Sequence, residues 1–326
     1  MAIQGEGARF EVLRFEGTGE QVGAAWLRAR RAGVGGSDVA AVMGLSAYKG
    51  AYTLWAEKSG LAEPEDISDR PAVHWGNVLE PVVGAEYRAN HPGREVRRVN
   101  GVCRSVERPW ALASLDYEVR DEGGTWGVLE IKTVGFRRAP DWDEGVPVYY
   151  QTQVQHYLDV TGRPYCDVAV LVAGQDYREY RIEADAEDQA AIRKAVDAFW
   201  AMVSSGEAPD PCACDSGALL KACGEGEGML EEADASDVPE LAAWLAAKAR
   251  ADAAKGALDE ATAALKGRIG AARGIEVPQG RVVWSRGKRR SFDRKRFDAD
   301  MPGVYELYQT EREADMGLRY TERKRS

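Results

Sequence analysis

The sequence predicts an α/β protein, with a long helix and a small β and basic appendage behind its core. Up to about residue 205, short strand-like apolar runs alternate with helical patterns across short connections. Gly123-Gly124 separates two strand-like runs, as in a hairpin. An Ala-rich segment over residues 240–273 has the composition of one long helix. We therefore expect a core at 1–205, a Gly- and acid-rich linker at 206–239 and an appendage at 240–326.

The core elements follow from periodicity and from turn residues. Ser37-Asp38 opens a short apolar helix after a glycine-rich turn, and Pro81 is expected to bend the third helix because proline removes a backbone donor. Val154, Tyr157 and Leu158 share a helical spacing. The expected helices cover residues 37–44, 52–59, 74–90, 148–160 and 186–204, and the expected strands cover residues 111–120, 125–133, 166–172 and 177–182.

The appendage is predicted from its composition. The long helix has poor heptads, so we expect it to pack on its own domain rather than to form a coiled coil. A short β-segment at residues 282–285 and a basic tail follow. From Arg281 to Ser326 there are 13 Lys and Arg against 8 Asp and Glu, a surface suited to phosphate backbones.

Bulk composition limits the function classes. The 326 residues are 44% hydrophobic and 29% charged, as in ordinary globular proteins, and no run approaches the ~18 apolar residues of a membrane span. The first ten residues lack signal-peptide order, so a cytoplasmic location is expected. The net charge of -10 argues against a protein that coats nucleic acid, but it permits an enzyme with acidic metal ligands. Five cysteines, an odd number, make a disulfide framework unexpected.

The strongest chemical signal is Asp116 followed by Glu130-Ile131-Lys132. Strand alternation places Glu130 and Lys132 on one face, and the hairpin brings Asp116 towards them. Two carboxylates and the Ile131 carbonyl are hard oxygen ligands that suit Mg²⁺, and the lysine can orient and help deprotonate an attacking water. The alternative is a solvated charged hairpin.

Five segments in order strengthen the nuclease interpretation. They run from Trp26 to Asp38, from Leu45 to Trp55, from Trp75 to Pro81, over Asp116 with Glu130-Ile131-Lys132, and from Gln151 to Tyr157. Together they resemble the YqaJ-type viral recombinases, a lambda-exonuclease-like family of the PD-(D/E)xK nuclease superfamily. The resemblance covers about the first half of the chain. It implies a restriction-endonuclease-like core, a mixed sheet flanked by helices.

The resemblance also implies roles for individual residues. Arg30 and Ser37 would bind a DNA 5′-phosphate, and Ser37 opens a helix whose free N–H groups favour anions. Glu80 would be a further metal ligand beside Asp116, Glu130 and the Ile131 carbonyl. Gln153 would hold the attacking water or the scissile phosphate, and Tyr157, four residues later on the same helical face, would support it. Solvated surface residues are the alternatives for Arg30 and Glu80. For Gln153 the alternative is an ordinary polar residue over a core aromatic, and for Ser37 it is a plain N-cap.

The implied activity is a DNA exonuclease that degrades duplex DNA from a 5′ end and leaves single strands for phage-type recombination. The resemblance further implies two Mg²⁺ ions, with Mn²⁺ able to substitute, a homotrimer, a single-strand annealing partner, and a phage or prophage origin. An endonuclease on the same fold is one rival, and the Arg30–Ser37 pair argues against it. A catalytically silent DNA-binding protein is another, and intact Asp116, Glu130 and Lys132 argue against that.

Other metal and cofactor sites are weakly supported. Cys212, Cys214 and Cys223 lack a recognised cluster spacing, and Cys103 or Cys166 would have to supply a fourth ligand, so an iron–sulfur or zinc site is unexpected. The three histidines, His74, His91 and His156, lack zinc spacing and are expected at the surface or at helix ends.

Overall fold

The computed structural model describes residues 9–16, 19–67, 69–223, 233–288 and 290–310. The described residues fall into two compact units, the first ending at residue 223 and the second covering 233–310. Among them, no helix combines the length and the apolar character that a bilayer span requires. Each unit is described by itself.

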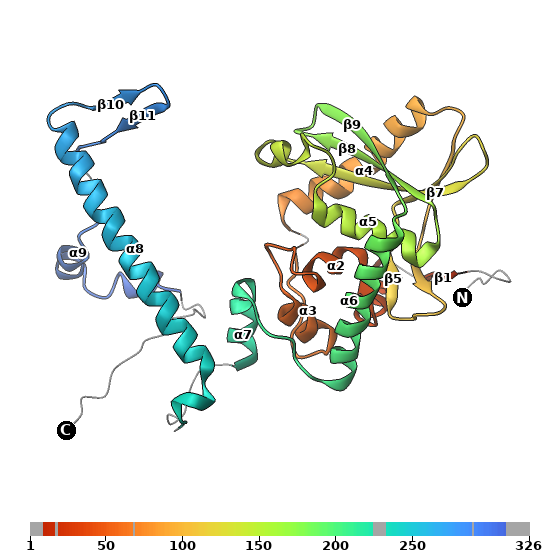
Figure 1. Ribbon diagram of the computed structural model, residues 1–326, viewed down its shortest axis with the longest axis horizontal. Helices are drawn as coiled ribbons and strands as arrows, with labels where there is room; N and C mark the ends of the chain where they lie inside the picture. Colours follow the sequence, from red (N-terminus) through yellow and green to blue (C-terminus); the bar gives the residue numbers. More distant parts are fainter. Residues whose placement is uncertain (1–8, 17–18, 68, 224–232, 289, 311–326) are drawn as a thin grey trace. The chain divides into compact units, whose positions relative to one another are not determined.

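A five-stranded mixed sheet is the centre of the first unit (Figure 1). Its order is β3-β6-β7-β8-β9, and all neighbours are antiparallel except β7 and β8, which are parallel. The α5 crossover joins β7 to β8, as a parallel pair requires. The strands are β3 Glu95–Arg98, β6 Tyr117–Arg120, β7 Trp126–Val134, β8 Tyr165–Val172 and β9 Asp176–Glu183.

Helices cover both faces of this sheet (Figure 1). Val83 and Tyr87 of α4 (Pro71–Asn90) pack on one face with Leu129, whereas Val154 and Leu158 of α5 (Val148–Thr161) pack on the other. A further layer beyond α5 contains α2 (Gly36–Val42), α3 (Ala51–Lys58) and α6 (Ala186–Ser205) around their own apolar core. The predicted mixed α/β fold with flanking helices is confirmed.

A smaller four-stranded sheet completes the unit. It has the order β1-β4-β5-β2, from β1 Phe10–Leu13, β4 Val102–Ser105, β5 Ala111–Ala113 and β2 Val34–Gly35, and α1 (Gly19–Arg31) leads into β2. His156 of α5 is fully buried beneath it, where its Nε2–H donates to the carbonyls of Val34 and Leu112 at 3.2 and 3.1 Å. Its expected place at the surface or at a helix end is therefore wrong.

The predicted strand at residues 111–120 is two strands in two different sheets. β5 belongs to the smaller sheet and β6 to the larger one, with Asp116 in the break between them. Leu115 and Tyr117 are both buried, so the apolar pattern continues across the break and no glycine or proline marks it. The expected hairpin of residues 111–133 is present as β6–β7.

The segment expected as a linker contains structure that belongs to the first unit. η2 (Ala213–Asp215) and α7 (Ser216–Cys223) both contact α3. The position of the core boundary therefore stays a prediction.

The second unit consists mainly of α8 (Pro239–Ile269), which lies within the predicted long helix. It is preceded by η3 (Ala235–Asp237) and followed by the hairpin β10 (Gly274–Val277) and β11 (Gly280–Val283), then α9 (Arg294–Asp300) and η4 (Glu306–Tyr308). Most α8 side chains are exposed, so the expected packing of this helix along its own domain is not seen among the described residues. Arg286 donates to carbonyls at the C-terminal end of α8, an arrangement that satisfies backbone acceptors there. Of the predicted basic tail, residues 289 and 311–326 lie outside the described residues.

Candidate active site

The predicted acidic residues converge at an open edge of the larger sheet. A pocket there is lined by Gly76, Asn77, Glu80, Asp116, Glu130, Ile131, Lys132 and Thr133. The pairing of β6 with β7 ends at Tyr117–Leu129, so residues 130–134 of β7 extend beyond β6. Asp116 occupies the space where β6 would continue, and its Oδ2 accepts the Ile131 N–H at 2.9 Å.

The break between β5 and β6 therefore has a direct role in building the site. A residue in an extended strand turns its amide and carbonyl to the same side. Because the Ile131 amide faces Asp116, the Ile131 carbonyl faces the same open edge. The three acceptors predicted from the hairpin motif are thus brought together, although Asp116 does not lie within a strand.

Glu130 is a buried carboxylate that is only half satisfied. Its side chain is 3% exposed. Its Oε1 accepts from Lys132 Nζ at 2.5 Å and from Gln153 Nε2 at 2.8 Å, whereas its Oε2 is buried without a hydrogen-bond partner. Burial, followed by repulsion from the Asp116 carboxylate, raises the pKa of Glu130 to about 8. An orphaned buried acceptor of this kind is unfavourable unless a cation or donor joins it.

Asp116 and Glu80 complete an acidic group around this oxygen. Burial raises the pKa of Asp116, although Lys132 and the Ile131 N–H lower it in part. Burial and then Asp116 raise the pKa of Glu80, whose Oε1 accepts from Arg98 at 2.6 Å. Three carboxylates therefore share one pocket with two paired cations, Lys132 and Arg98, and further positive charge would stabilise all three.

Lys132 is held as a donor within the site. Burial lowers its pKa, but the Glu130 and Asp116 carboxylates outweigh this and the net pKa is raised. Its Nζ also lies 3.4 Å from Gln153 Oε1 and 4.7 Å from the centre of the Tyr150 ring. A charged ammonium in this place can orient a water or attract a phosphate, since it has protons to donate.

Gln153 and Tyr157 connect this pocket to the start of α2. Gln153 Nε2 donates both to Glu130 Oε1 and to Tyr157 Oη, each at 2.8 Å. Gly36 packs against the Tyr157 ring so closely that a Cβ there would lie 2.4 Å from it and 3.0 Å from Gln153. The predicted helical pair therefore contacts both the acidic pocket and the glycine turn before Ser37.

Arg30, near the end of α1, and Ser37, in the first turn of α2, lie together, as the sequence predicts. Arg30 Nη2 donates to Ser37 Oγ at 2.7 Å, and Ser37 is exposed. Lys58 of α3 joins them through Asp38 at 2.8 Å and through the Arg30 carbonyl at 2.7 Å. Burial would raise the pKa of Asp38, but Lys58 and Arg30 lower it overall. Two cations thus face one carboxylate, which leaves positive charge beside the exposed Ser37 hydroxyl.

The acceptor set fits a divalent hard cation. Glu80, Asp116, Glu130 and the Ile131 carbonyl are oxygen donors of the kind that Mg²⁺ and Mn²⁺ prefer. A cation bound here would supply a partner for Glu130 Oε2 and would lower the raised carboxylate pKa values.

Sequence reasoning missed several residues that shape the two pockets. Arg98, Lys58 and Tyr150 contact site residues from β3, α3 and α5. Tyr150 stands beside Gln151 in the recognised helix, so its place could have been inferred from that motif. Arg98 and Lys58 are paired across 18 and 20 residues with Glu80 and Asp38, and no local pattern marks such partners.

Comparison with known proteins agrees with the recognised motifs. Residues 25–164 match the YqaJ-like viral recombinase domain. The chain is 37% identical over 188 residues to the uncharacterised protein YqaJ of Bacillus subtilis (strain 168), over 56% of this chain and 57% of that one. It is 29% identical over 171 residues to a protein of African swine fever virus (strain Badajoz 1971 Vero-adapted), over 45% of this chain and 48% of that one. The chain thus spans about half the length of these curated relatives.

Among solved structures, this chain is similar to an alkaline exonuclease from Laribacter hongkongensis. The two share 27% sequence identity, and the match has a TM-score of 0.47 and covers 56% of this chain and 94% of that one. The acidic pocket, Gln153, Tyr157 and the Arg30–Ser37 pair all lie inside the matched range. Over residues 25–164 this chain is therefore similar to the YqaJ-like viral recombinase domain.

Proposed function

We propose that this chain is a metal-dependent DNA exonuclease that hydrolyses duplex DNA from a 5′ end and leaves single strands for recombination. The observation that carries the proposal is the orphaned Glu130 Oε2 in a pocket shared with Asp116 and Glu80. Relatives of the domain include a solved alkaline exonuclease, which agrees with nuclease activity.

Glu80, Asp116, Glu130 and the Ile131 carbonyl would hold Mg²⁺, two ions by family resemblance, with Mn²⁺ as a substitute. When bound, the metal supplies positive charge for the scissile phosphate and for the attacking water. Lys132 donates a hydrogen bond to that water or to a phosphate oxygen, because its pKa is raised and it stays charged. Gln153 keeps Glu130 in place through its 2.8 Å bond and also reaches the water or scissile phosphate.

The Arg30–Ser37 pair supports action at an end rather than inside a strand. Arg30 and Lys58 outnumber the single Asp38 carboxylate, so an anion beside Ser37 would be favourable. Gly36 joins this place to Tyr157 and Gln153. A terminal 5′-phosphate bound there would lie next to the acidic pocket, which is the arrangement that end-directed cleavage requires.

A labelled-end assay tests the proposal. Linear duplex DNA with one labelled 5′-phosphate is incubated with Mg²⁺ beside a closed circular duplex. The wild type should release labelled mononucleotides and leave the circle intact, while Lys132→Ala releases none. A cut circle would favour the endonuclease, and DNA binding without cleavage in Mg²⁺ or Mn²⁺ would favour the silent binding protein.

Arg30→Ala tests the end pocket separately. It should slow cleavage of 5′-phosphorylated ends by about 10-fold or more, as expected for the loss of a charge-assisted hydrogen bond worth ~1.5–3 kcal/mol, and should have less effect on 5′-hydroxyl ends. Arg28→Ala is the matched control, because Arg28 is an exposed arginine of the same helical turn. Equal losses on both kinds of end would contradict a phosphate pocket at Arg30.

Family resemblance alone supports three further proposals. The chain would act as a homo-oligomer, a trimer, with a single-strand annealing protein as partner, in the cytoplasm of a bacterial host that carries it as a phage or prophage gene. Light scattering on the purified chain tests the trimer, and a monomeric mass at micromolar concentration would contradict it.

A further inference from the structure

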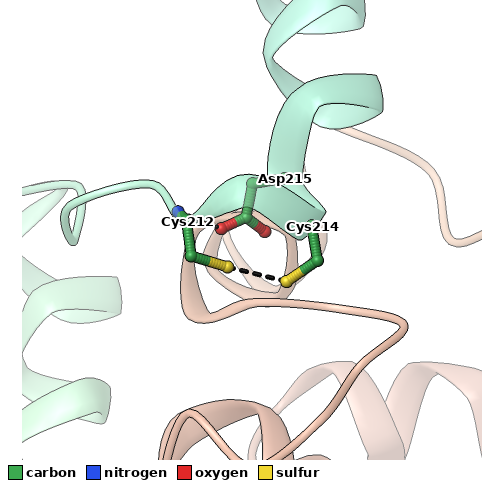
Figure 2. Close-up of side chains that lie close together, drawn as sticks. All are labelled: Cys212, Cys214 and Asp215. Atoms are coloured by element: carbon green, nitrogen blue, oxygen red, sulfur yellow. Dashed lines mark hydrogen bonds between the residues drawn. The ribbon is translucent and has the colours of Figure 1, made fainter. Parts of the chain in front are cut away.

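Two cysteines outside the nuclease pocket lie unusually close together. Cys212 precedes the η2 turn and Cys214 lies within it, and their Sγ atoms point towards each other 2.7 Å apart (Figure 2). Cys212 is exposed and Cys214 is partly exposed, so small molecules can reach the pair. Asp215 lies beside them and, with the two thiols, forms a group of metal-ligand type.

Asp215 accepts hydrogen bonds on both carboxylate oxygens. It is 0% exposed. Its Oδ1 accepts from the backbone amides of Gly50 and Thr53 at 3.1 and 3.0 Å and from Thr53 Oγ1 at 2.5 Å, and its Oδ2 accepts from the Cys212 amide at 2.8 Å. These bonds satisfy free amides in the first turn of α3. Asp215 therefore links the η2 turn to α3, and a metal ligated by Asp215 would compete with these hydrogen bonds.

The distance between the sulfurs also argues against a shared metal ion. Two thiolates bound tetrahedrally at ~2.3 Å from zinc lie roughly 3.8 Å apart. The observed 2.7 Å is well below that separation and is closer to the ~2.05 Å of a disulfide bond. Without Asp215 only two ligands remain, and Cys223, at the far end of α7, is not part of the group.

We propose that Cys212 and Cys214 are a redox-active dithiol that forms a reversible disulfide by exchange with a low-molecular-weight disulfide such as oxidised glutathione. Cys212, the more exposed residue of the two, attacks the small disulfide as its thiolate, forms a mixed disulfide and releases one small thiolate, which takes up a proton. Hydrogen bonds with Cys214 and Asp215 raise the pKa of Cys212 to about 11, so this first step speeds up as the pH rises. The thiolate of Cys214 then attacks the Cys212 sulfur, closes the protein disulfide and releases the second small thiol. Two protein thiols are oxidised and one small disulfide is reduced to two thiols.

The Cys212–Cys214 disulfide would form in a turn that is already held against α3. A Cβ at Gly50 would lie 2.5 Å from Cys212 Sγ and 2.3 Å from Asp215 Oδ2, so only the bare α-carbon of glycine allows the turn to sit this close to α3. Because the Cys212 amide is held by Asp215, the first sulfur is positioned before reaction, and Cys214 follows two residues later. This preorganisation favours the bridge over a lasting mixed disulfide.

The reduced full-length chain is incubated with oxidised glutathione under native conditions, alkylated at free thiols and mapped by peptide mass spectrometry. Cys223 is the matched control, since it is an exposed cysteine of the same segment. We expect a bridge between Cys212 and Cys214, at least about 10-fold more abundant than glutathione adducts at either, while Cys223 carries glutathione. Dithiothreitol should reverse both.

Single cysteine variants distinguish a paired dithiol from exposed thiols that react independently. Cys214→Ser should stop the reaction at a glutathione adduct on Cys212, and Cys223→Ser should leave the bridge unchanged. Adducts on Cys212 or Cys214 without a bridge, or two unreactive thiols while Cys223 reacts, would overturn the proposal. So would one equivalent of Zn²⁺ that binds the wild type, protects both thiols from alkylation and fails to bind Cys212→Ser.

Discussion

Two buried carboxylates on opposite faces of the same sheet have opposite surroundings. Asp167 of β8 faces α4, and Glu130 of β7 faces α5. Asp167 is 5% exposed and Glu130 is 3% exposed. Arg181 donates to Asp167 twice, at 2.7 and 2.9 Å, and Tyr87 and Arg94 donate at 2.5 and 2.8 Å. Glu130 has donors on one oxygen only.

Burial alone therefore does not separate a structural carboxylate from a functional one. Asp167 has all its acceptors filled by the protein, so it ties β8, β9 and α4 together. Glu130 is surrounded by further carboxylates and keeps an empty acceptor. A protein keeps such a site when a ligand completes it, because an unsatisfied buried acceptor otherwise lowers stability.

The largest contrast should appear in nuclease activity. Glu130→Gln keeps the shape of the side chain but removes its charge, so cleavage of linear duplex DNA should fall by at least about 1000-fold. Asp167→Asn touches no reacting group and should retain activity within about threefold at a temperature where it is folded. Initial rates on the labelled duplex measure both. Full activity of Glu130→Gln would remove this carboxylate from the catalytic site.

For stability we expect the opposite result: the change at Asp167 should be more harmful than the change at Glu130. Asp167→Ala leaves Arg94, Arg181 and the Tyr87 hydroxyl without their acceptor, and loss of one partner of a buried ion pair costs about 3–5 kcal/mol. Urea unfolding of the metal-free protein should show this loss for Asp167→Ala and none for Glu130→Gln. A Glu130→Gln variant as unstable as Asp167→Ala would make Glu130 a structural residue.

A smaller effect concerns the pH dependence of stability without metal. The folded-state pKa of Glu130, about 8, exceeds the ordinary value of 4.5, so the folded protein binds the extra proton between these values. Stability should therefore fall as the pH rises from about 4.5 to 8. Glu130→Gln lacks this proton, so with chelator present its melting temperature should exceed that of the wild type by at least about 3 °C at pH 8.5. A constant difference across the pH range would contradict the raised pKa.

Local periodicity predicted much of the site. Alternation along β7 correctly put Glu130 and Lys132 on one face, and the four-residue spacing put Gln153 and Tyr157 together. These features depend on backbone geometry within single elements, which the sequence encodes locally. Ser37 beside Arg30 was likewise visible in one segment, although the expected glycine turn is the short strand β2 followed by the start of α2 at Gly36.

Other features depend on contacts that no local pattern encodes. The break between β5 and β6, which contains Asp116, was not predicted. Ala113, Leu115 and Tyr117 are all buried, so the alternating pattern continues while the chain passes from one sheet to the other. α8 was predicted in place, whereas its packing stays a prediction, since an Ala-rich helix shows little preference for one face. The sequence did not predict the ion-pair cluster at Asp167, because the partners of this residue come from α4, β9 and the segment before β3.

The binding of a divalent cation at Glu130 is the central claim, and Mn²⁺ titration followed by electron paramagnetic resonance tests it most directly. The signal of free Mn²⁺ reports how much ion the protein removes from solution. The wild type and Cys212→Ser should bind Mn²⁺ equally, whereas Glu130→Gln and Asp116→Asn should bind at least about 10-fold more weakly, as expected when a charged ligand is removed. Unchanged binding in Glu130→Gln would contradict the assignment of this pocket as the metal centre.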